Sequence, residues 1–325
     1  MDAAREWQLN ALTPVWTGSV KIENDREKIV NEQVVPIGLL GSIRWWFEVL
    51  VRGLDGSACD PIDTKCRAKD HCVVCELFGC TGWARKFRFQ VLAGADGDTI
   101  QREPLQMGNR FRLRFQPLRE IAPEEWALLD LTLHLIADYG AIGGKTVLKP
   151  SDETSRASRP HHQDYGIIDL LKGPFEKDGF AAGVRRRELE AYVRNGQWCT
   201  VQHGDFAWAS LRHFWCVNGK YLAREDADKS RFNRVIGREE QKARGQQIRN
   251  GQRRANEWLA GRQRESKKVF SFKSPARTFG FVKPGTVDFE AIKGRLRRAW
   301  PDLRDDEFLT GDEIIDRLLS GTTSS

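Results

Sequence analysis

Residues 38–53 read GLLGSIRWWFEVLVRG and predict an amphipathic helix. The apolar residues of this stretch recur at helical spacing and are expected to face a core: Leu39, Ile43, Trp46, Phe47, Leu50 and Leu54. Arg44, Glu48 and Arg52 follow one another at intervals of four and form a charged row on the opposite side. The stretch therefore combines one buried face with one polar face.

The segments around this helix predict the fold of the first half. A strand is expected over Leu9–Trp16, and alternating apolar residues predict two more over Ala84–Leu92 and Phe111–Phe115. A second amphipathic helix follows at Pro123–Tyr139, whereas residues 21–33 are polar and charged and are expected to form a loop. The order β-α-β-β-α fits a ferredoxin-like (RRM-like) α+β sandwich.

The length of 325 residues suggests two domains. We expect an N-terminal domain over 1–150, with a cysteine-rich insertion at 55–80, and a linker or mobile loop over 151–164. A C-terminal domain is expected over 165–318. The last segment, 319–325, is expected to be a disordered tail.

The composition is that of a folded protein outside the membrane. The chain is 40% hydrophobic and 30% charged, and it contains no uncharged apolar run near the roughly 18 residues that a spanning helix needs. Arg5, Glu6, Lys21 and Glu23 interrupt the N-terminus before the apolar core of a signal peptide could form. We therefore expect a cytoplasmic protein without a membrane partner.

Positive charge is concentrated in residues 229–268. This segment holds 13 basic and four acidic residues, an excess of 13 − 4 = +9, against +7 for the whole chain. Such a patch favours contact with a polyanion such as a nucleic acid. The alternative is a solvated helix face with ion pairs at i,i+4, but three basic residues for each acidic one leave most of the charge unpaired.

Five of the seven cysteines lie between residues 59 and 80. Cys72 and Cys75 have the two-residue spacing that turns both thiolates towards one metal ion, and Cys59 and Cys66 precede them in a polar stretch without periodicity. We predict a structural zinc ion bound by these four, with Cys80 or His71 as substitute ligands. Disulfides are the alternative, which the odd number of cysteines and the lack of an export signal disfavour.

No catalytic or nucleotide-binding motif is complete. Gly140-Ala-Ile-Gly-Gly-Lys-Thr146 has three residues between its first glycine and Gly-Lys-Thr, whereas a P-loop needs four and a preceding strand. Its glycines could still bring the backbone close to another polyanion, with Lys145 as a point charge, or form a plain helix-ending turn. His161 and His162 lie in the expected loop without an evident acid or nucleophile beside them. We expect no nucleotide cofactor and no enzymatic activity.

Three strings resemble a known family: Leu12-Thr-Pro-Val-Trp-Thr-Gly18, the helix at 38–53, and Cys75-Glu-Leu-Phe-Gly-Cys-Thr-Gly-Trp-Ala-Arg-Lys-Phe87. Together they resemble the RAMP superfamily of CRISPR effector subunits over about the first 150 residues. The greatest likeness is to the first subunits of type III-B (Cmr) complexes. The resemblance implies two ferredoxin-like RAMP domains, with the predicted zinc-binding loop inserted in the first.

The resemblance also implies a function, which is non-catalytic binding of guide and target RNA at one end of a type III ribonucleoprotein for antiviral defence. Its partners would be other RAMP subunits. By position the family implies five RNA-contact candidates: Arg44, Trp45, Arg85, Lys86 and Lys145. Packing against a neighbouring element is the alternative for Trp45. The basic segment adds Arg231, Arg234, Arg238, Arg249 and Arg253. Two alternatives stay open, a different RAMP subunit of a type III-D-like complex and a metal-independent ribonuclease that processes guide RNA.

Overall fold

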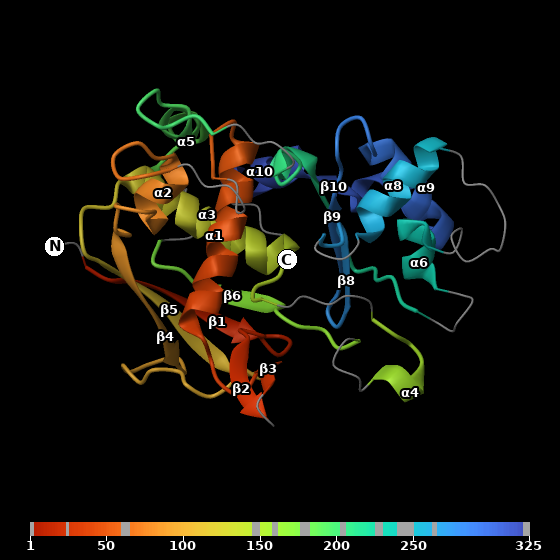
Figure 1. Cartoon of the computed structure of the whole chain (residues 1–325), viewed down its shortest axis with the longest axis horizontal. Coiled ribbons are helices and arrows are strands. Elements are labelled where there is room, and N and C mark those ends of the chain that lie inside the picture. The colour runs from red at the N-terminus through yellow and green to blue at the C-terminus, as the bar shows by residue number, and fades with distance from the viewer. Residues whose placement is uncertain are drawn as a thin grey trace. The chain divides into compact units, whose positions relative to one another are not determined.

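The computed structural model divides the chain into two compact units. It describes residues 3–23, 26–59, 66–144, 150–157, 162–175, 183–201, 206–224, 230–238, 250–261 and 265–320, with only the backbone described at 19–23, 26–30 and 250–253. Unit 1 comprises residues 1–145, 165–212 and 312–325, and unit 2 comprises residues 146–164 and 213–311. Each unit is built around its own sheet (Figure 1).

Unit 1 contains a four-stranded antiparallel sheet in the order β4-β5-β1-β6. Its strands are β1 (Arg5–Ala11), β4 (Phe87–Ala93), β5 (Arg110–Pro117) and β6 (Ile168–Lys172). Helices α1 (Pro36–Gly53) and α3 (Pro123–Tyr139) connect β1 to β4 and β5 to β6, and they pack side by side against the sheet (Figure 1). This β-α-β-β-α-β order, with the first and third strands in the middle, is the ferredoxin-like topology.

The sequence explains why these elements form. In β1, Trp7, Leu9 and Ala11 alternate with less buried residues, so one face of the strand enters the core. Helix α3 begins at Pro123, which needs no hydrogen-bonded N–H there, and the Glu125 carboxylate accepts a hydrogen bond from the Ala122 N–H at 2.8 Å. These local signals produce the predicted strand and helix.

Smaller elements complete unit 1. They are the β2–β3 hairpin (Ser19–Glu23 and Arg26–Val30), α2 (Val73–Phe78), α5 (Arg186–Val193) and α10 (Gly311–Ser320), with a 3-10 turn at Leu211–His213. The hairpin corrects the loop expected over 21–33, because charged residues on both of its strands hide the alternation that marks a half-buried strand.

Unit 2 repeats the topology with different sequence. Its antiparallel sheet has the order β10-β7-β9-β8. The strands are β7 (Phe214–Asn218), β8 (Val269–Lys273), β9 (Ala276–Phe281) and β10 (Leu309–Thr310), and the helices are α4 (Thr154–Ala157), α6 (Arg231–Ile236), α8 (Asn250–Ala260) and α9 (Phe289–Ala299), with a 3-10 turn at Asp305–Glu307. An apolar core that includes Trp215, Phe232 and Leu296 fills the space between sheet and helices. The prediction of two ferredoxin-like domains is confirmed.

The unit boundaries differ from the expected ones. β6 pairs with β1, so residues from 165 onward complete the first sheet instead of starting a second domain. Part of the expected linker at 151–164 belongs to unit 2, where the Asp164 carboxylate accepts backbone N–H bonds from Lys273 and Ser274. In the expected tail, residues 319 and 320 end α10, and residues 321–325 lie outside the described part.

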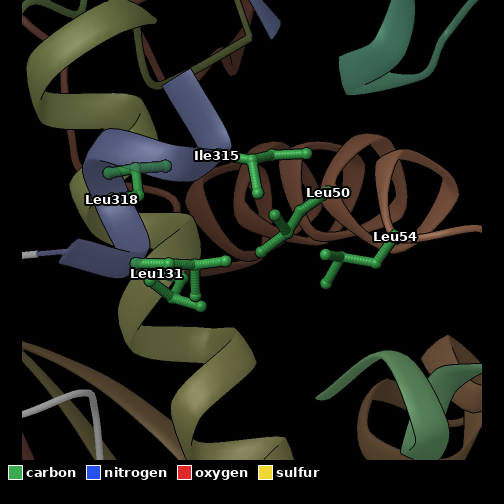
Figure 2. A pocket seen from close by; sticks show the side chains of 6 residues that line it. Leu50, Leu54, Leu131, Ile315 and Leu318 are labelled. Atoms are coloured by element: carbon green, nitrogen blue, oxygen red, sulfur yellow. The ribbon is translucent and has the colours of Figure 1, made fainter. Parts of the chain in front are cut away.

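Helix α10 returns the chain to unit 1. Figure 2 shows Ile315 and Leu318 of this helix beside Leu50 of α1, Leu54 directly after α1 and Leu131 of α3. These side chains, together with Leu319, line one apolar seam. The last helix is therefore part of the core of the first unit. None of the helices in the described ranges is long and apolar enough to cross a membrane.

Candidate metal centre

Four cysteines of unit 1 form one buried cluster. The Sγ atoms of Cys59, Cys66, Cys72 and Cys75 all lie within 4.8 Å of one another, and each residue is at most 1% exposed. Cys59 Sγ lies 3.2 Å from the Sγ atoms of Cys66 and Cys75 and 3.5 Å from that of Cys72. A tetrahedral ion with metal–sulfur bonds of about 2.3 Å holds its sulfurs about 3.8 Å apart. The group thus has the size of a four-sulfur metal site.

Local backbone structure brings the last three cysteines together. Residues Arg67 and Asp70 close a tight turn between Cys66 and Cys72 through reciprocal N–H···O bonds of 2.9 Å. Cys72 is the N-cap of α2, and its N–H donates to Cys66 Sγ at 3.2 Å, while Cys75 lies in the first turn of the helix. The CxxC spacing therefore places both thiols at the same end of α2, a helix that the sequence analysis did not predict.

The crowding of the thiols separates the pKa values of Cys59, Cys72 and Cys75. Hydrogen bonds with Cys59 and Cys66 lower the pKa of Cys72, whereas contacts with Cys66 and Cys72 raise that of Cys59. Hydrogen bonds with Cys59 and Cys66 raise the pKa of Cys75. The Cys72 thiolate therefore forms readily while Cys59 and Cys75 hold their protons. A divalent cation among them would favour all four thiolates, because it offsets their mutual repulsion.

The substitute ligands do not belong to the cluster. Both ring nitrogens of His71 have other partners, the Ala68 carbonyl at Nδ1 and Glu76 Oε2 at 2.7 Å from Nε2. The ring packs against Trp83 at an interplanar angle of 35°, with centroids 4.7 Å apart. Cys80 is partly exposed and outside the group of four. All seven cysteines are unbridged.

The charged row of α1 faces this cluster. Arg44 donates from Nη2 to Cys75 Sγ at 3.2 Å, from Nη1 to the Gly79 carbonyl at 2.9 Å and from Nε to Glu48 at 3.0 Å. Arg52 donates to the Cys59 carbonyl at 2.5 Å. Glu48 and Arg52 are buried, and burial raises the pKa of Glu48 although both arginines oppose that effect. Helical spacing identified the row, but it carried no signal that a cysteine cluster would cover it.

Lys86, an expected RNA contact, is buried between two carboxylates. Its Nζ lies 2.8 Å from Glu125 Oε2 and 2.6 Å from Glu76 Oε1. Burial opposes the ionisation of Glu76, but hydrogen bonds from Lys86 and His71 outweigh it and lower the pKa of that carboxyl. This network joins α2 to the starts of β4 and α3.

The other candidates of the first half lie in different surroundings. Trp45 is half-buried with its ring at an edge-to-face angle to Trp46, and the centroids are 4.9 Å apart. Arg85 is half-buried, and its side chain has no hydrogen bond or ion pair with the described residues. Lys145 lies outside those residues. In the adjacent glycine segment, the N–H groups of Gly143 and Gly144 donate to Ser42 Oγ and the Trp16 carbonyl, so the protein itself occupies them.

The basic candidates of unit 2 are partly described. Arg231 lies 3.7 Å from Asp152 and over the ring of Tyr221. Arg234 is exposed and donates to the Arg298 carbonyl at 3.3 Å. Arg238 lies two residues after α6 and donates to the Ala260 carbonyl. Arg249 and the side chain of Arg253 lie outside the described part of the chain.

Comparison with known proteins adds the family. A sequence model described as the RAMP superfamily matches residues 8–148. The chain is similar to the RAMP superfamily over this segment, which is less than half of its length. The segment runs from β1 to α3 and includes the whole cysteine cluster, so the candidate metal centre lies within the matched residues. No curated protein matches the chain.

Several solved structures are similar to this chain. The apo form of Cmr1 from Pyrococcus furiosus has 12% identity and a TM-score of 0.44, with 98% of this chain and 96% of that chain covered. A chain of a type IV-B CRISPR complex has 12% identity and a TM-score of 0.29, with coverage of 51% and 88%. A chain of the Csm3–Csm4 subcomplex of a type III-A complex has 17% identity and a TM-score of 0.24, with coverage of 51% and 73%.

Proposed function

We propose that this chain is an RNA-binding, non-catalytic subunit of a type III CRISPR ribonucleoprotein that holds guide and target RNA beside other RAMP subunits. The observation that carries the proposal is the RAMP match over residues 8–148, joined to a ferredoxin-like topology that unit 2 repeats. Base pairing between guide and target would supply sequence specificity, and the protein would contact the RNA backbone.

The charge distribution supports RNA as the ligand. The excess of +9 in residues 229–268 exceeds the net charge of the chain, and Arg234 presents an exposed guanidinium there. In unit 1, Arg85 follows the Leu-Phe-Gly turn and keeps its side-chain donors unused by the described residues. Planar guanidinium groups suit bidentate phosphate contacts. Arg85 and Arg234 are therefore the first residues to test.

The cysteine cluster is proposed to hold structural zinc. Four sulfur donors are typical of closed structural zinc sites, in which no position remains for a reacting water. The described residues of the insertion, 55–59 and 66–80, hold only short elements, so a bound ion would supply order that a small apolar core cannot. Bound zinc would supply no chemistry beyond holding these four thiolates together.

Fluorescence anisotropy of a labelled single-stranded RNA tests the binding proposal. We expect affinity to fall steeply with salt, because each neutralised phosphate contributes about −0.7 to the log–log slope for single strands. Arg85→Ala and Arg234→Ala should each weaken binding and reduce the slope. Arg185→Ala is the matched control, since that exposed guanidinium is paired with Glu188. Absence of binding at low salt would contradict the proposal.

Catalysis is tested separately by incubating repeat RNA with the protein in EDTA. We expect the RNA to stay intact. A single defined cut that disappears in a His161→Ala/His162→Ala double variant would establish the ribonuclease alternative. His162 is 5% exposed, which leaves little of its surface for a substrate. The assembled complex can be captured from cells and its subunits identified. Their identities distinguish a type III-B from a type III-D-like assembly.

A further inference from the structure

The charged row of α1 is oriented towards the cysteine cluster at two points. Arg44 reaches the last cysteine, Cys75, through its sulfur, and Arg52 reaches the first, Cys59, through its carbonyl oxygen. Glu48 lies between the two arginines in the helix and accepts a hydrogen bond from Arg44 at 3.0 Å. One helix face thus contacts both ends of the ligand set.

The net positive charge of this row opposes the negative charge that a metal ion with four thiolates would carry. Four thiolates around a divalent cation carry a net charge of −2, and that charge would be buried, because every cysteine of the cluster is at most 1% exposed. Buried charge is costly unless it is paired or hydrogen-bonded. The row supplies two positive groups and one negative group, a net charge of +1. The guanidinium of Arg44 donates a hydrogen bond directly to a sulfur of the cluster.

We propose that Arg44 and Arg52 are positioning residues of the metal centre, with Arg44 as the charged hydrogen-bond donor to the Cys75 thiolate. The inference rests on the proposed function, in that the cluster must hold a metal ion. Groups that orient metal ligands in this way typically account for about 10–100-fold in metal affinity. It assigns Arg44 a role different from the RNA contact that family resemblance implies.

A further hydrogen bond of Arg44 positions the turn that follows the last cysteine ligand. Its Nη1 donates to the carbonyl of Gly79, the residue that ends α2 at φ +84°. A Cβ added at Gly79 would lie 2.7 Å from the backbone nitrogen of Arg85. Arg44 therefore fixes Cys75 and the turn after α2 together. Lysine could replace its charge but not its three directed bonds.

Cobalt(II) titration of the apo-protein tests the inference, because the sulfur-to-cobalt charge-transfer band reports the metal–thiolate bonds themselves. Zinc affinity follows from competition with the bound cobalt. For Arg44→Gln we expect affinity about 10–100-fold weaker and a charge-transfer band at lower energy, since the thiolate loses a hydrogen bond. Arg52→Gln should weaken affinity without moving the band, because Arg52 contacts a carbonyl. Arg44→Lys should recover part of the affinity.

Arg88→Gln is the matched control, an exposed arginine in β4 that should leave both readouts unchanged. Wild-type affinity and an unshifted band in Arg44→Gln would overturn the inference while leaving the metal site intact. A wild-type protein that binds no cobalt and no zinc would overturn the metal proposal and this inference together. If Arg44→Gln fails to fold, Arg44→Lys decides: its affinity should stay below that of the wild type because lysine cannot make the three directed bonds, and wild-type affinity with an unshifted band would refute the positioning role of the guanidinium.

Discussion

Replacing Lys86 with methionine separates a structural role from an RNA contact. Methionine keeps much of the apolar stem but removes the ammonium that lies 2.8 Å from Glu125 and 2.6 Å from Glu76. The Glu125 side chain is 1% exposed, so its carboxylate would lose its charge partner without gaining water. The Ala122 N–H, at 2.8 Å, remains as a donor to it.

The expected cost follows from this burial. Breaking a buried ion pair by removing one partner costs about 3–5 kcal/mol of unfolding free energy. For a folded unit of this size, each kcal/mol lowers Tm by about 2–4 °C, so Lys86→Met should lower Tm by about 6–20 °C. Burial already raises the pKa of Glu125. Loss of Lys86 raises it further, so the deficit should shrink in acid, where the carboxyl takes up a proton.

Thermal unfolding and RNA anisotropy on the same samples provide the assay. Adding Glu125→Gln to Lys86→Met should recover part of the lost Tm, because the uncompensated charge disappears. Arg88→Met is the control, and at that exposed position the change should stay within about 0.5 kcal/mol. A Lys86→Met protein with wild-type Tm and greatly weakened RNA binding would refute the reasoning and make Lys86 an RNA contact.

Four further substitutions, used in three experiments, test other parts of unit 1. Burial raises the pKa of Asp130, so the folded state binds a proton there more tightly than the unfolded state does. Wild type therefore loses stability as pH rises from below 3.8 to neutral, and Asp130→Asn should gain stability relative to it. Parallel urea titrations of the two proteins that show no pH trend in the difference would contradict this. Gly97→Ala should cost about 1–2 kcal/mol for its positive φ, and Gly79→Ala about 1–3 kcal/mol more, since its Cβ meets backbone atoms while that of Gly97 meets open space. Equal urea midpoints for the two variants would argue against the tight turn after α2. Cys72→Ser should reduce bound zinc, measured by elemental analysis, from one equivalent and lower Tm; unchanged values of both would refute the site.

Features that depend on residues close together in the sequence were the most predictable part of the site. The CxxC spacing of Cys72 and Cys75 identified two neighbouring thiols because a tight turn and a helix start determine where they lie. The apolar stripe of α1 was equally visible, because its period matches the helix. Spacing showed which residues share a face, but it could not show that the cysteines would cover the row of Arg44, Glu48 and Arg52.

Lys86 and β6 show why longer-range features escaped prediction. The alternation in β4 suggested an outward Lys86, yet β4 begins one residue later, and the Lys86 N–H bonds instead to the Leu77 carbonyl at 3.0 Å. The five-residue strand β6 buries fully only Ile168, so its sequence carries almost no strand signal. Its pairing with β1 joins residues far apart in the chain. Because of this pairing, residues from 165 onward belong to unit 1, and the domain boundary predicted at 165 is wrong.

The return of α10 to the first unit has a consequence for synthesis of the protein on the ribosome. All of unit 2 is translated before residues 312–320, whose leucine and isoleucine side chains close the seam on α1 and α3. Unit 1 therefore has to wait for nearly the entire chain to emerge before its core is complete, although it contains the N-terminus. A nascent chain stalled before residue 312 would expose Leu50, Leu54 and Leu131 to chaperones, and unit 2 would finish folding first.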